Sequence, residues 1–377
     1  MHPNPVIYLD YAATSPVCPE VAAQMQACLT QEGLFANPAS LHRPGQMARE
    51  AVESARAQIA LAIHAEPSEI IFTSGATESC NLAIKGAAQL HTAKGRHIIT
   101  LQTEHSAVLD SCEALEKNGF QVTRLAPRPN GQLDPDILKE ALRPDTTLIS
   151  ILHVNNETGV IQDIASIADI TSKNGILLHV DAAQTIGKVT LDLKKIPADL
   201  VSLCAHKCGG PKGIGALYLR KKPRVRVAAQ IQGGGQEQGM RSGTLATHQI
   251  VGMASAFTLA TTLLDEETRR ITHLQLLLLE RLRGTDFILH GERHLTVPHI
   301  LSLRFRGVPA KQLMEKCPTL AFSTGSACHG KSHEPSHVLR AMGLSREEAL
   351  CAIRLSFGRF TTPEMIAYAA DILLAAL

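Results

Sequence analysis

The chain has 377 residues, of which 45% are hydrophobic and 19% are charged, and its formal net charge is +2. This length favours two domains, because single hydrophobic cores stop growing near about 250–300 residues. Basic and acidic residues are interspersed, so the charge favours neither a nucleic acid nor a membrane surface as a partner.

Targeting signals and cysteine usage indicate the compartment. No apolar stretch reaches the ~18 residues of a membrane span, and residues 1–5 lack the charged and apolar regions of a signal peptide. The nine scattered cysteines fit reduced thiols better than disulfides. We therefore expect a cytoplasmic protein.

Short apolar runs alternate with helical patterns from about residue 69 onward. The runs are Glu69–Thr73, His97–Leu101, Thr147–Leu152, Gly175–Val180 and Asp199–Leu203. Near-continuous apolar strands separated by helices indicate a buried, mostly parallel sheet in an α/β fold. Ligands bind such sheets beyond the carboxyl ends of the strands.

Polar residues follow all five runs. They are Ser74–Thr77, Glu104–His105, Asn155–Glu157, Asp181 and His206–Lys207. Because the carboxyl ends of parallel strands lie at one edge of a sheet, we expect these residues to converge on one site.

The C-terminal part predicts a smaller α+β domain. A long helical pattern from Thr247 to about Arg283 is expected to link the domains. Beyond it lie strand candidates at 300–305 and 353–357, and helices are predicted after Pro309, Pro335, Ser345 and Pro363. We assign residues 15–260 to the large domain and residues 1–14 and 261–377 to the small one.

Three residues together indicate chemistry on an amino acid. Lys207 follows a buried run in a glycine-rich turn, where a lysine is placed to bind a cofactor aldehyde. Asp181 ends another run, and a buried carboxylate needs a cation such as a protonated pyridine nitrogen, unless it caps a helix. Cys328 lies between small residues and a polar tract, which favours a nucleophilic thiolate. We infer a pyridoxal phosphate (PLP) enzyme acting on a sulfur or selenium amino acid.

Further candidates surround these three. Ala76 and Thr77 open a helix pattern; taken alone they favour an ordinary strand-to-helix turn, but together with Lys207 they indicate a phosphate-binding site. His105 could stack on PLP and move protons, or be structural. Arg354 is expected to bind the substrate carboxylate, and the alternative is that it forms an ion pair at the domain interface. Thr244 lies in a loop that we expect to reach a neighbouring subunit.

The residue spacing at one predicted strand also allows a metal site as an alternative. Cys204, His206 and Cys208 alternate, so their side chains could share a face. Tetrahedral zinc normally uses separated ligand pairs, and no second pair follows, so we expect no metal. His206 is interpreted instead as a neighbour of the lysine or of the PLP phosphate.

Taken in order, the motifs resemble a known family over nearly the whole chain. They are Tyr8–Thr14, Asn37–Ser40, Thr73–Glu78, Glu104–Val108, Val154–Glu157, Val180–Gln184, His206–Lys207, Gly239–Thr244, Gly325–Cys328, Glu334–Ser336 and Ile353–Arg359. This order resembles the class V aminotransferase-like PLP enzymes and, within them, the cysteine desulfurases of the NifS and IscS kind.

The resemblance implies PLP-dependent transferase fold type I, with a mostly parallel seven-stranded sheet in the large domain and a smaller α+β domain. It implies a homodimer whose active sites borrow a loop from the partner. It also implies L-cysteine as substrate, with alanine and an enzyme-bound persulfide as products, and a protein that accepts the sulfur.

Roles for individual residues follow from this resemblance. We expect Lys207 to bind PLP and remove the α-proton while Cys328 attacks the substrate sulfur and His105 assists proton transfer. The remaining expected contacts are the PLP phenolic oxygen for Gln184, the substrate carboxylate for Asn156 and Arg354, and the phosphate for Ala76, Thr77, Cys204, His206 and the partner's Thr244.

Two positions depart from the usual pattern. Cys204 stands where such desulfurases usually carry a serine, and a thiol is a poorer donor. Cys328 is followed by His329 rather than Thr or Ser, which resembles selenocysteine lyases and the desulfurases of DNA phosphorothioation systems. A selenocysteine lyase, a class V transaminase and a non-catalytic sulfur-carrier scaffold stay open, as does the pathway served: iron–sulfur cluster assembly, tRNA thiolation or DNA phosphorothioation.

Overall fold

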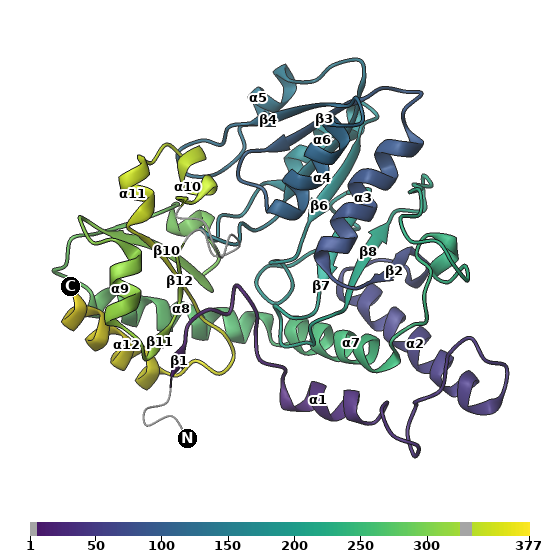
Figure 1. Cartoon of the computed structure of the whole chain (residues 1–377), viewed down its shortest axis with the longest axis horizontal. Coiled ribbons are helices and arrows are strands. Elements are labelled where there is room, and N and C mark those ends of the chain that lie inside the picture. The colour runs from purple at the N-terminus through teal and green to yellow at the C-terminus, as the bar shows by residue number, and fades with distance from the viewer. Residues whose placement is uncertain (1–5, 325–333) are drawn as a thin grey trace.

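The computed structural model describes residues 6–324 and 334–377, and its largest element is a seven-stranded sheet (Figure 1). The strand order is β2-β8-β7-β6-β5-β3-β4. The strands are β2 (Ile70–Thr73), β3 (His97–Leu101), β4 (Gln121–Leu125), β5 (Thr146–Leu152), β6 (Leu177–Asp181), β7 (Leu200–Cys204) and β8 (Gly215–Leu219). All five predicted strands are present, whereas β4 and β8 were not predicted. Because β8 pairs antiparallel with β2 and β7, the sheet is mixed but mostly parallel, as expected.

Helices cover both faces of this sheet. Successive strand residues point to opposite faces, so Ile71 shares a hydrophobic cluster with helical residues between 80 and 115, while Ile70 and Phe72 share another with helical residues in 52–60, 164–170 and 250–260. The helices of this part are α1 (Pro19–Gln26), α2 (Arg43–Ala62), α3 (Ala76–Leu90), α4 (Ser106–Glu116), α5 (Pro135–Glu140), α6 (Ile164–Lys173) and α7 (Thr247–Thr262), with short 3-10 turns η1 (Pro67–Glu69) and η2 (Glu237–Gly239). The strands are therefore buried on both sides, which explains their continuous apolar sequences.

The prediction of one long helix from Thr247 to about Arg283 is wrong. The chain leaves the helical conformation at Leu263 (φ −97°, ψ 8°), so α7 ends there and α8 (Leu264–Arg281) begins. The two helices bury their apolar faces against different cores. α7 packs on α1 and α2, whereas α8 packs on α12 (Pro363–Ala376).

The C-terminal part has its own antiparallel sheet, in the order β12-β13-β10-β9. Its strands are β9 (Phe287–Leu289), β10 (Ile300–Phe305), β12 (Ser323–Thr324) and β13 (Ala352–Ser356), beside a separate parallel pair of β1 (Ile7–Tyr8) and β11 (Leu320–Ala321). Its shorter helical elements are η3 (Arg293–Leu295), α9 (Ala310–Lys316), α10 (His337–Ala341) and α11 (Arg346–Leu350). Both predicted strands and all four predicted helices are confirmed.

A second hydrophobic cluster underlies this smaller sheet. It joins Ile7 and Leu9 to apolar side chains between residues 271 and 376, while the cores around the large sheet draw on residues 52 to 260. The N-terminal segment therefore lies with the C-terminal part, as Figure 1 shows. The division at residues 14/15 and 260/261 stays a prediction.

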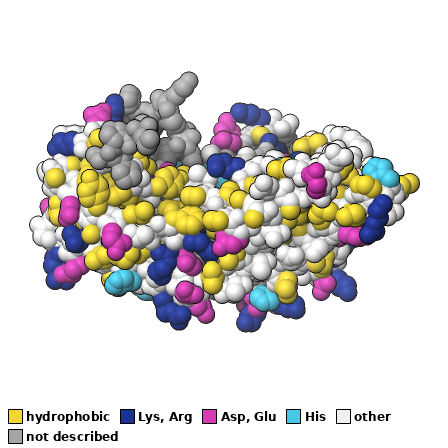
Figure 2. Space-filling view, turned by 90° about the horizontal axis from the view of Figure 1, so that it is seen from below, with side chains coloured by type: hydrophobic (Ala, Val, Ile, Leu, Met, Phe, Trp, Pro, Cys, Tyr) yellow, Lys and Arg dark blue, Asp and Glu magenta, His cyan; other side chains and the backbone are white. Residues whose placement is uncertain are grey.

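The surface carries both signs of charge. Figure 2 shows Lys and Arg side chains interspersed with Asp and Glu on one face, with apolar side chains between them. Among the described helices, none is long and apolar enough to cross a membrane.

Candidate active site

A cavity of about 590 Å³ lies at the carboxyl ends of the large-sheet strands. At least one residue from each of the five predicted strand ends lines it. Nine residues predicted for the site line this cavity: Ala76, Thr77, His105, Asn156, Asp181, Gln184, His206, Lys207 and Arg354. The topology thus brings together residues that lie up to 278 positions apart in the sequence.

Lys207 and Asp181 supply opposite charges to the cavity without neutralising each other or another group. In the described residues, neither side chain has an ion-pair partner within 4.0 Å. Asp181 is 6% exposed, and its Oδ1 accepts a hydrogen bond from Ala183 N at 2.9 Å. A buried carboxylate without a cation is costly, so this position suits a ligand that brings a positive charge.

The start of α3 offers donors for an anion. Helix termini leave the first N–H groups without intrahelical acceptors, and the N-cap here is Gly75, which has no side chain to cap them. Gly75 adopts φ +155°, and a Cβ at this residue would point into open space. Ala76 and Thr77 therefore present backbone N–H groups and a hydroxyl at the cavity wall.

His105 is the N-cap of α4. Its Nδ1 accepts a hydrogen bond from Ala107 N at 3.1 Å, so proton exchange at this ring must use Nε2. Burial lowers the pKa of His105, and the positive charge of Lys207 lowers it further, although Asp181 opposes the shift. The ring is therefore neutral at neutral pH.

His206 joins the N-terminal segment to the cavity. Its Nδ1 lies 3.2 Å from Thr14 Oγ1, and its carbonyl accepts from Ser15 N at 2.7 Å and from Ser15 Oγ at 2.9 Å. Burial, followed by the charge of Lys207, lowers the pKa of His206 to about 4. Because Nδ1 of the neutral ring contacts Thr14, the other ring nitrogen, Nε2, can donate or accept one hydrogen bond according to the tautomer.

Gln184 contributes a buried amide with hydrogen-bonding groups that remain available to a ligand. Its Nε2 donates to Ala12 O at 2.7 Å, and its Oε1 is buried without a partner among the described residues. An amide nitrogen carries two N–H groups, so one remains for a ligand.

Arg354 both forms an ion pair between segments and faces the cavity. Its Nη2 lies 2.7 Å from Asp10 Oδ1 and 3.2 Å from Ser323 Oγ, and its Nη1 donates to Asn156 O at 2.8 Å. Its Nε is buried without a partner in the described part of the chain. Arg354 can thus form an interface ion pair and also bind a substrate carboxylate, so the two interpretations are compatible.

Two predicted residues in the described part of the chain do not line the cavity. Cys204 is buried, and its Sγ donates to Ala183 O at 3.5 Å. Thr244 is exposed and lines a different cavity, together with Arg56 and Glu237. Cys328 lies outside the described residues, which end on one side at Thr324 in β12, next to the Ser323 that pairs with Arg354.

The sequence-based prediction missed several cavity residues and one buried lysine. Thr14, Lys212 and Gly213 line the cavity, and their only signal was their place in glycine- and alanine-rich motifs. Lys188 is 8% exposed, and its Nζ donates to the main-chain carbonyl of Lys207 at 3.3 Å. Burial lowers the pKa of Lys188 to about 8. No sequence signal pointed to this contact.

The residues fit PLP. An unpaired lysine, a buried carboxylate without a cation, a partly unpaired glutamine and an uncapped helix N-terminus match its aldehyde, ring nitrogen, phenolic oxygen and phosphate in turn. Among the described residues, no three His, Cys, Asp or Glu side chains are grouped to hold a metal ion.

Comparison with known proteins gives consistent matches over the whole fold. The family model "Aminotransferase class-V" matches residues 7–368. The chain is 53% identical to "Cysteine desulfurase IscS" of Photorhabdus laumondii over 369 residues, covering 97% of this chain and 91% of that protein. A solved "NIFS-LIKE PROTEIN" superposes with a TM-score of 0.92 at 34% identity, covering 99% and 100% of the two chains. The structure titled "SspA in complex with cysteine" gives a TM-score of 0.83 at 37% identity, covering 94% and 99%.

Proposed function

Because this chain belongs to the class V aminotransferase family and, within it, to the cysteine desulfurases, we propose that it converts L-cysteine to L-alanine and retains the sulfur as a persulfide on Cys328. The family is PLP-dependent. The observation that carries the proposal is the single cavity shared by Lys207, Asp181 and Arg354.

PLP supplies an aldehyde that binds amino groups and a ring that withdraws electrons from the substrate. Lys207 would hold the aldehyde, and Asp181 would keep the ring nitrogen protonated. Gln184 would donate to the phenolic oxygen. His206 and the start of α3 at Ala76 and Thr77 would bind the phosphate, assisted by Thr244 of the partner subunit.

The reacting groups of the substrate meet this chain's own side chains. Arg354 and Asn156 would bind the carboxylate while the substrate amine displaces Lys207 from the aldehyde. The freed Lys207 amine would then remove the α-proton, and neutral His105 would help to move it. The Cys328 thiolate then attacks the substrate sulfur. A sulfur–sulfur bond forms, the carbon–sulfur bond breaks with its electron pair left on the substrate, and protonation at that carbon gives alanine.

The destination of the sulfur is part of the same proposal. A persulfide transfers its outer sulfur to another thiol, so we propose a sulfur-acceptor protein serving iron–sulfur cluster assembly, tRNA thiolation or DNA phosphorothioation. We place this activity in the cytoplasm. The eight cysteines within the described residues are all free thiols, which supports a reducing compartment.

Turnover assays separate this function from its rivals. We expect the PLP-loaded protein to release alanine from L-cysteine, and Lys207→Ala to lose both turnover and the visible absorbance of the lysine-bound cofactor. An active, coloured Lys207→Ala protein would mean that another residue binds PLP. Trace turnover of L-cysteine beside rapid turnover of L-selenocysteine would replace the proposal with a selenocysteine lyase.

A homodimer with shared sites has its own test. Thr244 is exposed and lies away from this chain's cavity, which supports a role at a partner's site. Mixing inactive Lys207→Ala and Thr244→Ala subunits should then restore activity, because one of the two hybrid sites carries neither change. No recovery after verified subunit exchange would contradict the shared site.

A further inference from the structure

The segment from Gly233 to Thr244 runs irregularly past the edge of the large sheet and has an unusual backbone. Glu237 (φ 48°) and Gln238 (φ 59°) both adopt the left-handed conformation, which is unfavourable for residues with a Cβ. Such conformations persist where surrounding contacts impose them. The contacts of Glu237 identify what holds this loop.

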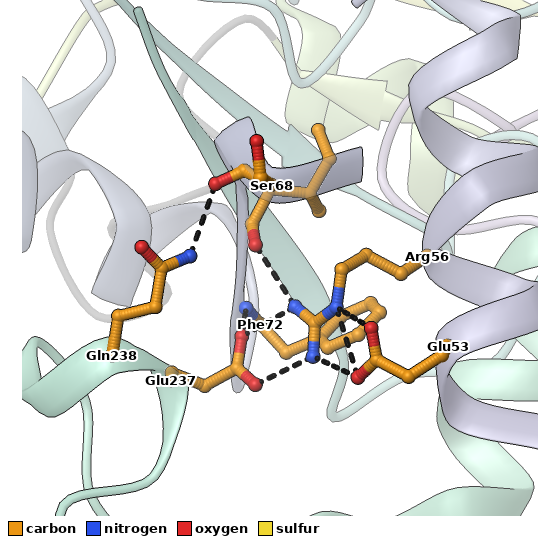
Figure 3. A network of polar contacts seen from close by, with 7 residues as sticks. Glu53, Arg56, Ser68, Phe72, Glu237 and Gln238 are labelled. Carbon is orange, nitrogen blue, oxygen red and sulfur yellow. Dashed lines mark hydrogen bonds and ion pairs between the residues drawn. The ribbon is translucent and has the colours of Figure 1, made fainter. Parts of the chain in front are cut away.

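A buried ion pair joins Glu237 to helix α2 (Figure 3). Arg56 donates from Nη2 to Glu237 Oε1 and from Nη1 to Glu237 Oε2, both at 2.8 Å. The side chains are 9% and 2% exposed. Arg56 also bonds Glu53 and lies 4.5 Å above the ring of Phe72. Two desolvated charges in bidentate contact fix the relative position of loop and helix.

The same pair completes the edge of the sheet. β2 is the first strand in the sheet order, so one side of its backbone has no neighbouring strand in the described fold. Glu237 Oε2 accepts from Phe72 N at 2.7 Å, and Arg56 Nη1 donates to Ile70 O at 2.9 Å. The pair thus replaces a strand by supplying one acceptor and one donor to β2.

A second contact joins this loop to the cavity. Arg241 donates from Nε to Glu78 Oε1 at 2.9 Å and from Nη2 to Glu78 Oε2 at 3.4 Å. Glu78 lies in the first turn of α3 and lines the cavity, and its Oε2 also accepts from Ser74 N at 2.7 Å. Although burial opposes the shift, these bonds lower the pKa of Glu78, so its carboxylate is charged.

A negative charge at this position opposes anion binding at the start of α3. Arg241 offsets the charge of Glu78, and it can do so only while the loop keeps its place. The loop is held four residues earlier, at Glu237. The contacts therefore form a continuous connection from α2 through the loop to the cavity wall.

We propose that Arg56 and Glu237 are positioning residues for the anion-binding end of the cavity and that they act through Arg241. This inference rests on the proposed function, because that function places the PLP phosphate at this end. Neither Arg56 nor Glu237 lines the cavity itself.

The test compares how the cofactor-free protein binds PLP and pyridoxal, which lacks the phosphate. We expect Arg241→Met and Glu237→Ala each to weaken PLP binding by about tenfold and to leave pyridoxal binding unchanged. In the double variant the loss should equal that of the larger single variant, because Glu237 acts through Arg241. Inorganic phosphate should compete with PLP less well in each variant than in the wild type.

Two further variants keep the comparison interpretable. Glu237→Gln retains an acceptor for Phe72 N, so it should destabilise the fold less than Glu237→Ala. We expect it to weaken PLP binding by a smaller factor and to leave pyridoxal binding unchanged. Arg304→Met breaks an ion pair between β10 and Glu348 of α11, which do not line the cavity, and should leave PLP binding unchanged.

Two results would overturn the inference. One is an equal loss of PLP and pyridoxal affinity in the Glu237 variants, which would indicate general disruption of the site. The other is additive losses in the double variant, which would mean that Glu237 acts independently of Arg241. Failure of the part of the proposed function on which this inference rests, the binding of PLP in the cavity, would look different, since the wild type would then bind neither PLP nor pyridoxal.

Discussion

Arg354 Nη2 lies 2.7 Å from Asp10 Oδ1, which joins a strand of the smaller sheet to the segment that follows β1. The Arg354 side chain is 4% exposed and is also held by the carbonyl of Asn156. An arginine fixed on two sides has lost its side-chain freedom before a substrate arrives. Its guanidinium is therefore preorganised where it faces the cavity.

Replacing this guanidinium should weaken substrate binding. Arg354→Lys keeps the charge but loses the planar fork, so we expect kcat/KM for L-cysteine to fall about 10- to 100-fold, mainly through KM. Alanine release at varied L-cysteine concentration measures this. Arg304→Lys, in the neighbouring strand β10, is the matched control and should match the wild type. An unchanged KM in Arg354→Lys would show that another group binds the carboxylate.

Lys188 should hold Lys207 in position, but burial of its charge should lower the free energy of unfolding. Its pKa is about 8 in the folded chain and about 10.5 when unfolded, so below pH 8 both states are protonated and the full burial penalty applies. We expect Lys188→Met to be more stable than the wild type at pH 7 by up to about 3 kcal/mol. Between pH 8 and 10.5 the unfolded wild type binds more protons, so wild-type stability rises and this difference shrinks.

Lys188→Met should turn over L-cysteine more slowly than the wild type, because it leaves the carbonyl of Lys207 without its hydrogen-bond donor. Urea unfolding at several pH values and alanine release at pH 8 test both parts. A variant that is less stable than the wild type at pH 7 would contradict the burial penalty, and full activity would show that Lys207 needs no such support.

Cys204→Ser tests whether this position contacts the phosphate. The thiol donates to Ala183 O and does not line the cavity, so a serine should strengthen that bond with little effect on PLP affinity. PLP titration of the cofactor-free variant measures the effect. A severalfold tighter affinity for PLP, with no change for pyridoxal, would place position 204 at the phosphate.

Five of the seven strands of the large sheet were predictable because they are buried on both faces and read as continuous apolar runs. β4 was missed because its exposed first residue, Gln121, and its half-buried Thr123 and Arg124 break such a run. The end of the helix at Leu263 was invisible because leucine favours helix, and only packing against two cores explains the break. The local sequence around Leu263 therefore does not predict the break.

The site was predictable where chemistry follows a strand end, as at Asp181 and Lys207. The contacts of Lys188 with Lys207 and of Glu237 with Arg56 depend on segments 19 and 181 residues apart, and neither has a local pattern. Long-range packing alone brings these groups together. The structure therefore adds the supporting residues rather than the reacting ones.

The central claim is that sulfur leaves L-cysteine as a persulfide on Cys328. Mass spectrometry of peptides after brief reaction of the PLP-loaded protein with L-cysteine, followed by thiol alkylation, tests it most directly. We expect the peptide containing Cys328 to gain the mass of one sulfur atom, and Cys328→Ala to bind PLP normally but to release no alanine. Alanine release by Cys328→Ala at the wild-type rate, or a persulfide on another cysteine alone, would contradict the account.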